Sequence, residues 1–185
     1  MPNGTIADLG GGTGGFIAGL YVGFGSMGFG KGADERRDAV LGALRTNRMR
    51  GILATGWGGL SAPDSPADDV LVVGSAPHDR LFERVAAVVH HGGAGSTAAG
   101  LRAGRPTLVC PFVGDQPFWG AQVHAAGAGP APLRPARMRA QLTGRLGDLV
   151  RNEGYRERAR AIAGRIAAED GLATGVRVLE DLLPA

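Results

Sequence analysis

A segment rich in histidine and glycine is the part of this chain best suited to chemistry. Residues 90–97 read HHGGAGST and follow the apolar run 85–89, which predicts a buried parallel strand. Residues 98–103 behind the segment predict a helix. A glycine-rich turn between strand and helix presents backbone N–H groups at the positive end of the helix dipole. The sequence therefore predicts an anion site that can hold a diphosphate without a metal.

A second polar pair follows the next predicted strand. Residues 105–112 predict this strand and residues 116–126 the helix after it, so Asp115 and Gln116 fall where the strand ends. Ligands of open α/β sheets bind at the carboxyl ends of the strands. A carboxylate beside an amide that donates and accepts suits vicinal sugar hydroxyls. Together the two sites predict a nucleotide-sugar ligand, and no Asp-x-Asp or His/Cys cluster points to a metal.

The whole chain alternates between apolar runs and amphipathic segments, which predicts an α/β fold with a Rossmann-like parallel sheet flanked by helices. Asp34 is expected to cap the first helix, and Cys110 to be an inert thiol in the core. Strands are expected at 21–25, 51–55, 70–74, 85–89 and 105–112, and helices at 34–45, 79–84, 98–103, 116–126, 135–150, 154–168 and 172–183.

The chain divides into a glycine-rich leader or linker, residues 1–20, and one nucleotide-sugar-binding domain, residues 21–185. Residues 5–16 fit the pattern D-x-G-x-G-x-G and resemble the first motif of S-adenosylmethionine-dependent methyltransferases. Such a motif needs a following helix and a second strand that ends in an acid. Only residues 16–20 remain before the next strand, so a methyltransferase fragment is the less favoured alternative.

Composition is that of one globular domain. The chain has 185 residues, of which 44% are hydrophobic, and a single cysteine, which excludes an internal disulfide and predicts a cytoplasmic location. No apolar run approaches the ~20 residues that span a membrane, and no signal peptide is evident. The net charge is +3, and acidic residues interleave with the arginines of the last third. This pattern favours a solvated helix face over a nucleic-acid surface.

Five segments in order carry a family resemblance: 22–27 (VGFGSM), 54–60 (ATGWGGL), 76–82 (APHDRLF), 90–97 and 114–120 (GDQPFWG). From about residue 21 onward the chain resembles the C-terminal, donor-binding half of GT-B-fold glycosyltransferases. The motifs are most similar to those of bacterial enzymes that glycosylate antibiotics and of sterol glucosyltransferases. The resemblance implies that His91 contacts the diphosphate, that Asp115 and Gln116 hold the donor sugar, and that the backbone at 76–78 reads the base.

The candidate site residues fall into three sets, one each for the diphosphate, the sugar and the nucleoside. For several of them a structural alternative stays open: Asp115 could cap a helix, Ser26 could be a turn serine, and Trp57 and Trp119 could be core aromatics. His90 is expected to pack inside the fold. The predicted sets are His91, Gly93, Gly95, Ser96, Thr97 and Ser26 for the diphosphate; Asp115 and Gln116 for the sugar; and Trp57, Ala76 and His78 for the nucleoside.

The resemblance implies an inverting glycosyltransferase that uses a UDP- or TDP-sugar, needs no cofactor, and acts on a small natural-product or sterol-like acceptor. The base that activates the acceptor is expected in an N-terminal domain that these 185 residues do not match, so no catalytic residue is assigned here. The chain alone is expected to be inactive and is a candidate for self-association. The alternative is a nucleotide-binding module without catalysis.

Overall fold

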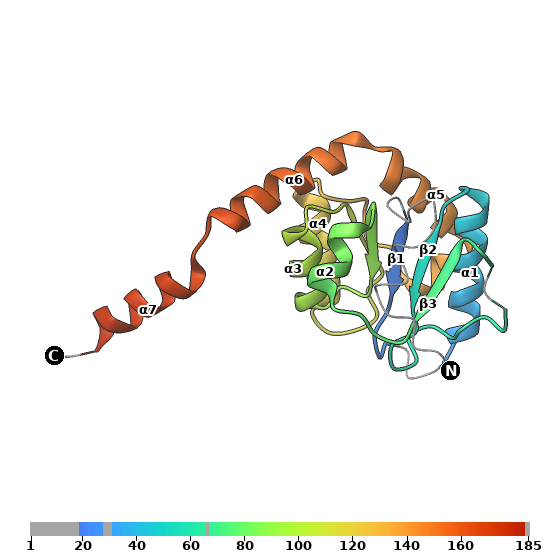
Figure 1. Ribbon diagram of the computed structural model, residues 1–185, viewed down its shortest axis with the longest axis horizontal. Helices are drawn as coiled ribbons and strands as arrows, with labels where there is room; N and C mark the ends of the chain where they lie inside the picture. The colour runs from blue at the N-terminus through green and yellow to red at the C-terminus, as the bar shows by residue number, and fades with distance from the viewer. Residues whose placement is uncertain (1–18, 28–30, 66, 184–185) are drawn as a thin grey trace.

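The computed structural model describes residues 19–27, 31–65 and 67–183. Its centre is a five-stranded sheet in the order β3-β2-β1-β4-β5, with every neighbouring pair parallel (Figure 1). The chain therefore builds outward from β1 in one direction as far as β3, and then returns to the other side of β1 with β4. Loops that leave β1 and β4 consequently diverge, and a ligand crevice forms at such a switch point. The strands are β1 (Leu20–Gly23), β2 (Gly51–Ala54), β3 (Val70–Val73), β4 (Ala87–His90) and β5 (Thr107–Val109).

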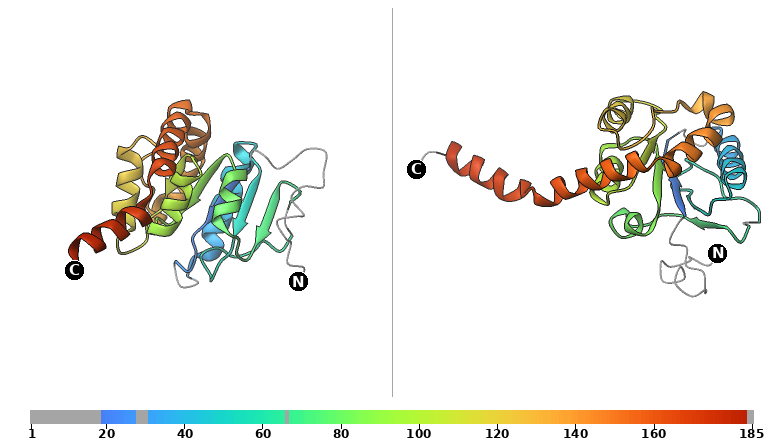
Figure 2. Two further views of the ribbon diagram at one scale, coloured as in Figure 1. Left: turned by 60° about the vertical axis from the view of Figure 1, so that its left-hand side comes forward. Right: turned by 90° about the horizontal axis from the view of Figure 1, so that it is seen from above.

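Helices cover both faces of the sheet (Figures 1 and 2). Helices α1 and α5 pack together on one face, α2 and α3 lie on the other, and α6 packs on α3. Helix α7 projects away from the domain and exposes Leu172, Leu179 and Leu182 (Figure 1). No described helix is long and apolar enough to cross a bilayer. The bounds are α1 (Ala33–Thr46), α2 (His78–Leu81), η2 (Phe82–Arg84), α3 (Ala94–Arg102), α4 (Gln116–Ala125), η3 (Pro135–Arg137), α5 (Met138–Arg151), α6 (Glu153–Ala168) and α7 (Gly171–Leu182).

The core is split by the sheet because alternate strand residues point to opposite faces. Leu20 and Val22 of β1 belong to the cluster on the α1 and α5 side, whereas Tyr21 belongs to the cluster with Phe82 on the opposite face. Cys110 is fully buried directly after β5, and burial raises the pKa of its thiol to about 12. It is therefore an inert core thiol, as its place in the sequence predicts.

The predicted fold class is confirmed, with two corrections at helix starts. Helix α1 begins at Ala33 with Gly32 as its N-cap, so the prediction that Asp34 caps it is wrong. Asp34 instead accepts hydrogen bonds from Arg37 and Ser61. Helix α3 begins at Ala94, four residues before its predicted start. The glycines obscured this start, because glycine has low intrinsic helix propensity and tertiary packing overrides it. The methyltransferase-like residues 5–16 lie outside the described part of the chain.

Beyond β5, an extended segment at residues 128–133 lies against that strand. Thr107 donates its backbone N–H to the Ala128 carbonyl at 2.9 Å, and Leu133 donates to the Val109 carbonyl at 2.9 Å. Between them, the Gly129 backbone lies so close to the Thr107 carbonyl that a β-carbon at position 129 would overlap the oxygen. A glycine at this position lets the segment lie close against the start of β5.

Replacement of Gly129 by alanine is expected to lower the free energy of unfolding by about 1–3 kcal/mol, because the new methyl group forces the segment away from β5. Gly144→Ala is the matched control: this glycine is in the interior of α5 with open space around it. The control should raise stability by about 0.5–1 kcal/mol. Urea unfolding of both variants measures the difference, and equal stability of the two would contradict the close approach.

Candidate functional site

The imidazole of His91 lies between the loop after β1 and the start of α3, where the reversal of strand order is expected to leave a crevice between β1 and β4. A methyl group in place of the Gly93 hydrogen would lie 2.7 Å from His91 Nε2, and one at Gly25 would lie 3.4 Å from Cε1 of the same ring. The ring is therefore held between the loop that follows β1 and the N-cap of α3. Ser26, exposed in the β1 loop, follows Gly25 on that side of the crevice. The structure thus brings together residues from the first and fourth segments of the sequence pattern.

The first turn of α3 offers unpaired donors beside this ring. Thr97 is the first residue of the helix whose N–H reaches a carbonyl of the same turn, that of Gly93 at 3.0 Å. The N–H groups of Ala94, Gly95 and Ser96 precede it and have no carbonyl partner among the described residues. Thr97 itself is buried, and its hydroxyl donates to the Gly93 carbonyl at 3.0 Å. A phosphate contact by Thr97 would need that bond to break.

The electrostatics of His91 favour a neutral ring. Burial lowers the pKa of His91, the nearby His78 lowers it further, and the charge of Asp115 raises it. Nδ1 of the ring is buried without a hydrogen-bond partner among the described residues. A buried polar atom without a partner is uncommon in a folded protein and here lies in a crevice lined by amide donors. An anion in the crevice would favour the charged imidazolium.

The neighbouring His90 has a structural task. It is 1% exposed, as its predicted packing inside the fold requires, and its Nδ1 accepts the backbone N–H of Gly92 at 2.8 Å. Gly92 has φ of 96°, and a β-carbon there would crowd Val109 and the Gln116 carbonyl. Burial lowers the pKa of His90 to about 3, so the ring stays neutral and keeps accepting this hydrogen bond. His90 thereby fixes the turn that leads into α3.

Asp115 occupies the N-cap position of α4 without capping it. Its carboxylate accepts no helix-cap hydrogen bond and instead accepts the indole N–H of Trp119 at 2.7 Å. The side chain is exposed, so one carboxylate oxygen remains available to a ligand. The alternative that Asp115 caps the helix through its side chain is not what the structure shows. Its role toward a sugar stays a prediction.

Gln116, the other residue predicted to hold the sugar, is buried inside the loop. Its Oε1 accepts the N–H groups of Phe112 and Val113 at 2.8 and 3.1 Å, and its Nε2 lies 3.1 Å from the sulfur of Met27. One amide hydrogen is left for any other partner. The geometry shows Gln116 as the side chain that shapes the β5–α4 loop and ties it to the β1 loop.

The residues predicted to read the nucleoside lie around the ends of β2 and β3. Trp57 is 88% exposed at the tip of the loop after β2, so it is not a core aromatic. His78 begins α2 and stacks on Phe82, while its Nε2 lies 3.0 Å from the Tyr21 hydroxyl. These contacts anchor the loop that contains Ala76. Contact of Trp57, Ala76 or His78 with a base remains a prediction.

Sequence reasoning missed one side chain that assembles the edge of the site. Arg36 of α1 is buried, and it donates from Nε to the Gly59 carbonyl at 2.8 Å and from Nη1 to the Lys31 carbonyl at 2.7 Å. Gly59 in turn donates its N–H to the Gly25 carbonyl at 2.9 Å. Arg36 therefore joins the loops after β1 and β2. Nothing in the local pattern around Arg36 signals this, because its partner Gly59 is 23 positions away.

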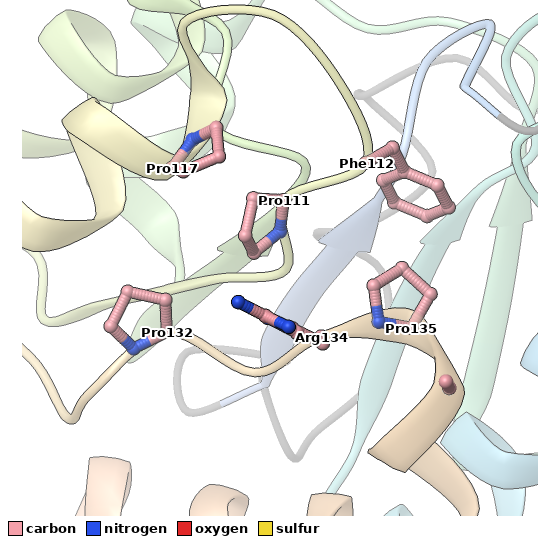
Figure 3. A pocket seen from close by; sticks show the side chains of 7 residues that line it. Pro111, Phe112, Pro117, Pro132, Arg134 and Pro135 are labelled. Carbon is pink, nitrogen blue, oxygen red and sulfur yellow. The ribbon is translucent and has the colours of Figure 1, made fainter.

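A hollow of about 670 Å³ lies on the other side of the β5–α4 loop (Figure 3). Its walls are mostly proline rings from the β5–α4 loop and from residues 132–135, and the fixed φ of proline makes these two segments stiff. None of its lining residues belongs to the predicted diphosphate set, so the hollow is distinct from the His91 crevice. It is lined by Pro111, Phe112, Pro117, Pro132, Arg134, Pro135 and Ala136.

Two solved structures with this architecture are glycosyltransferases. The calicheamicin glycosyltransferase CalG4 matches 89% of this chain with a TM-score of 0.75 and 22% identity, and the match covers 42% of that protein. SnogD from Streptomyces nogalater matches 94% of this chain with a TM-score of 0.71 and 21% identity, covering 44% of that protein. At these identities the likeness establishes the fold. The domain is one half of a GT-B glycosyltransferase fold, as predicted.

The chain belongs to the family described as erythromycin biosynthesis protein CIII-like, C-terminal domain, whose model matches residues 60–182. It is 40% identical over 166 residues to a sterol 3-beta-glucosyltransferase of Arabidopsis thaliana, which covers 90% of this chain and 26% of that enzyme. It is 41% identical over 162 residues to the vancomycin aglycone glucosyltransferase of Amycolatopsis orientalis, covering 88% of this chain and 38% of that enzyme. The chain thus spans well under half the length of these relatives, and the predicted family is confirmed.

The buried His90 predicts a pH dependence of stability. Its pKa is about 3 in the fold and about 6.5 in an unfolded chain, so the unfolded state binds the extra proton between these values. The contribution of neutral His90 to the free energy of unfolding should therefore be fully present above pH 6.5. Below pH 6.5 the free energy of unfolding should fall by about 1.4 kcal/mol per pH unit. His90→Asn keeps an acceptor for the Gly92 N–H and removes the titration. Urea unfolding from pH 7 to pH 4 should show a slope shallower by this amount in the variant; parallel slopes would contradict the assignment.

Proposed function

We propose that this domain binds the diphosphate of a UDP- or TDP-sugar in the crevice between β1 and β4. The observation that carries the proposal is the His91 ring, held between Gly25 and Gly93 at the N-terminus of α3 with an unpartnered buried Nδ1. Three free amide groups and the helix dipole add positive potential at the same place. These groups neutralise a diphosphate without a metal ion.

The domain's part in sugar transfer is electrostatic. Direct displacement at the anomeric carbon leaves the nucleoside diphosphate with growing negative charge. The α3 amides and His91 are fixed in place before the reaction and stabilise that charge as it develops. Asp115 holds sugar hydroxyls through its free carboxylate oxygen, and this positions the anomeric carbon. Gln116 acts through the shape of the loop, since its amide is already bonded to the backbone.

In the whole protein the acceptor and the base that deprotonates it belong to a second half, because the relatives are two to four times as long as the matched region. The relatives are named for sterols and for the vancomycin aglycone, which supports a large, largely apolar small-molecule acceptor. The 185 residues by themselves are proposed to transfer no sugar. A cytoplasmic location and self-association through the exposed side chains of α7 are parts of the same proposal.

Two other functions make different predictions. A nucleotide-binding module without catalysis would use the same crevice and would bind nucleotide equally well, but the full-length protein would transfer nothing. A methyltransferase would bind S-adenosylmethionine through residues 5–16, which the structure does not describe. S-adenosylmethionine offers a sulfonium and a carboxylate, and neither suits the groups around His91 better than a diphosphate does. The site therefore supports the nucleotide-sugar proposal.

Calorimetric titration of the chain with UDP, TDP and S-adenosylmethionine tests the proposal. UDP or TDP should bind in the presence of EDTA, and S-adenosylmethionine should not. His91→Ala should weaken nucleotide binding by about 1–3 kcal/mol, the range for losing a hydrogen bond to a charged group. Asp115→Asn should leave nucleoside diphosphate affinity unchanged and weaken only the nucleotide-sugar.

Unchanged nucleotide affinity in a folded His91→Ala protein would contradict the diphosphate assignment. Equal losses for nucleotide and nucleotide-sugar in Asp115→Asn would make Asp115 a structural residue. Turnover of a UDP-sugar with phenolic acceptors by the purified 185 residues would show that the acceptor site is already present in this chain. Slow hydrolysis of the donor would not, because water needs no acceptor site.

A further inference from the structure

We infer that Trp119 is a positioning residue for the donor sugar, which it never needs to touch. Its indole N–H holds one oxygen of the Asp115 carboxylate, so the other oxygen faces the ligand in one orientation. This inference rests on the proposed function, since it assigns a partner within the same site. Its consequence is that Trp119 governs the extra affinity for a nucleotide-sugar over the bare nucleoside diphosphate.

Two hydrogen bonds join Asp115 to Trp119 across one helical turn. The Trp119 backbone N–H donates to the Asp115 carbonyl at 3.2 Å, and the indole Nε1–H donates to Asp115 Oδ2 at 2.7 Å. The second is a charge-assisted bond at the short end of the usual range. Asp115 Oδ1 has no hydrogen-bond partner in the described part of the chain. The carboxylate is therefore half fixed by the protein and half open.

The local sequence explains why the carboxylate turns toward the indole. An N-cap side chain ordinarily accepts the N–H of the second or third helical residue. In α4 the second residue is Pro117, which has no N–H to give, and Asp115 has a helical φ of −81° and ψ of −6° instead of the extended backbone typical of an N-cap. The indole four positions after Asp115 lies on the same side of the helix and supplies a donor instead. The pair therefore depends on the order of residues 115–119 and not on a chance surface contact.

The indole of Trp119 is half-buried on α4. Trp119 lines a small hollow between α3, α4 and α6, together with Thr97, Leu101 and Ile166. Phe118 meets the ring edge-on, with centroids 5.2 Å apart. Because Thr97 belongs to the first turn of α3, this hollow borders both the indole and the helix of the proposed anion site. The charge of Asp115 also raises the pKa of His91.

Trp119→Phe tests the inference because it keeps an aromatic ring and removes only the N–H donor. Calorimetry with UDP and with UDP-glucose as probes gives two affinities for each protein. UDP affinity should stay within about twofold of wild type, while the preference for UDP-glucose should fall by about tenfold, the low end for a hydrogen bond to a charged group. Phe118→Leu is the matched control: it alters the packing of the ring and should keep the wild-type preference.

The indole N–H resonance supplies a second readout that needs no ligand. The chain has two tryptophans, and Trp57 is 88% exposed, so it serves as an internal reference. In an ¹H–¹⁵N spectrum, Asp115→Ala should move the Trp119 indole signal upfield and leave that of Trp57 in place. In wild type, UDP-glucose should shift the Trp119 signal further than UDP does.

If the Trp119 indole signal does not move in Asp115→Ala, the hydrogen bond between the indole and the carboxylate is absent and the inference is overturned. An unchanged preference for UDP-glucose in folded Trp119→Phe would also overturn it, and so would an equal loss in Phe118→Leu, which would make Trp119 a packing residue only. Failure of wild type to bind UDP or TDP would overturn the proposed function itself, while the ligand-free spectrum would still decide whether the indole holds the carboxylate.

Discussion

The site depends on one close packing arrangement, the His91 ring between the backbones of Gly25 and Gly93. A β-carbon at Gly93 would lie 2.7 Å from Nε2 and displace the ring, whereas one at Gly25 would meet Cε1 at an ordinary contact distance of 3.4 Å. The arrangement is possible because the strand order reverses between β1 and β4, so that the two loops diverge and leave room for an imidazole. The proposed diphosphate site follows from an imidazole and a helix N-terminus facing the same space.

The loops around this space are tied together before any ligand arrives. Arg36 joins the loops after β1 and β2, and Gln116 joins the loops after β5 and β1. His90 fixes the turn into α3 by accepting the Gly92 N–H. Donors that are already oriented lose little freedom when an anion binds, and this is the source of electrostatic catalysis in a preorganised site.

Much of this fold could be predicted from sequence because its signals are local. Buried parallel strands read as short apolar runs, and loops between them read as glycine, proline and aspartate. The start of α3 at Ala94 was obscured by the glycines that the anion site needs. The burial of Gln116 depends on Met27, 89 positions away, and no local pattern encodes it. The Asp115–Trp119 pair was the exception, because a four-residue spacing across a proline could have revealed it.

The most direct test of the central claim is the pKa of His91, measured by NMR of its ring with and without UDP-glucose. The chain has four histidines, and His91→Ala identifies the signal. Burial should hold the pKa of free His91 below its ordinary value of 6.5. A diphosphate against the ring should raise this pKa by about one unit or more, since an opposite charge favours the protonated form. A pKa that does not change when the nucleotide-sugar binds would contradict the placement of the diphosphate at His91.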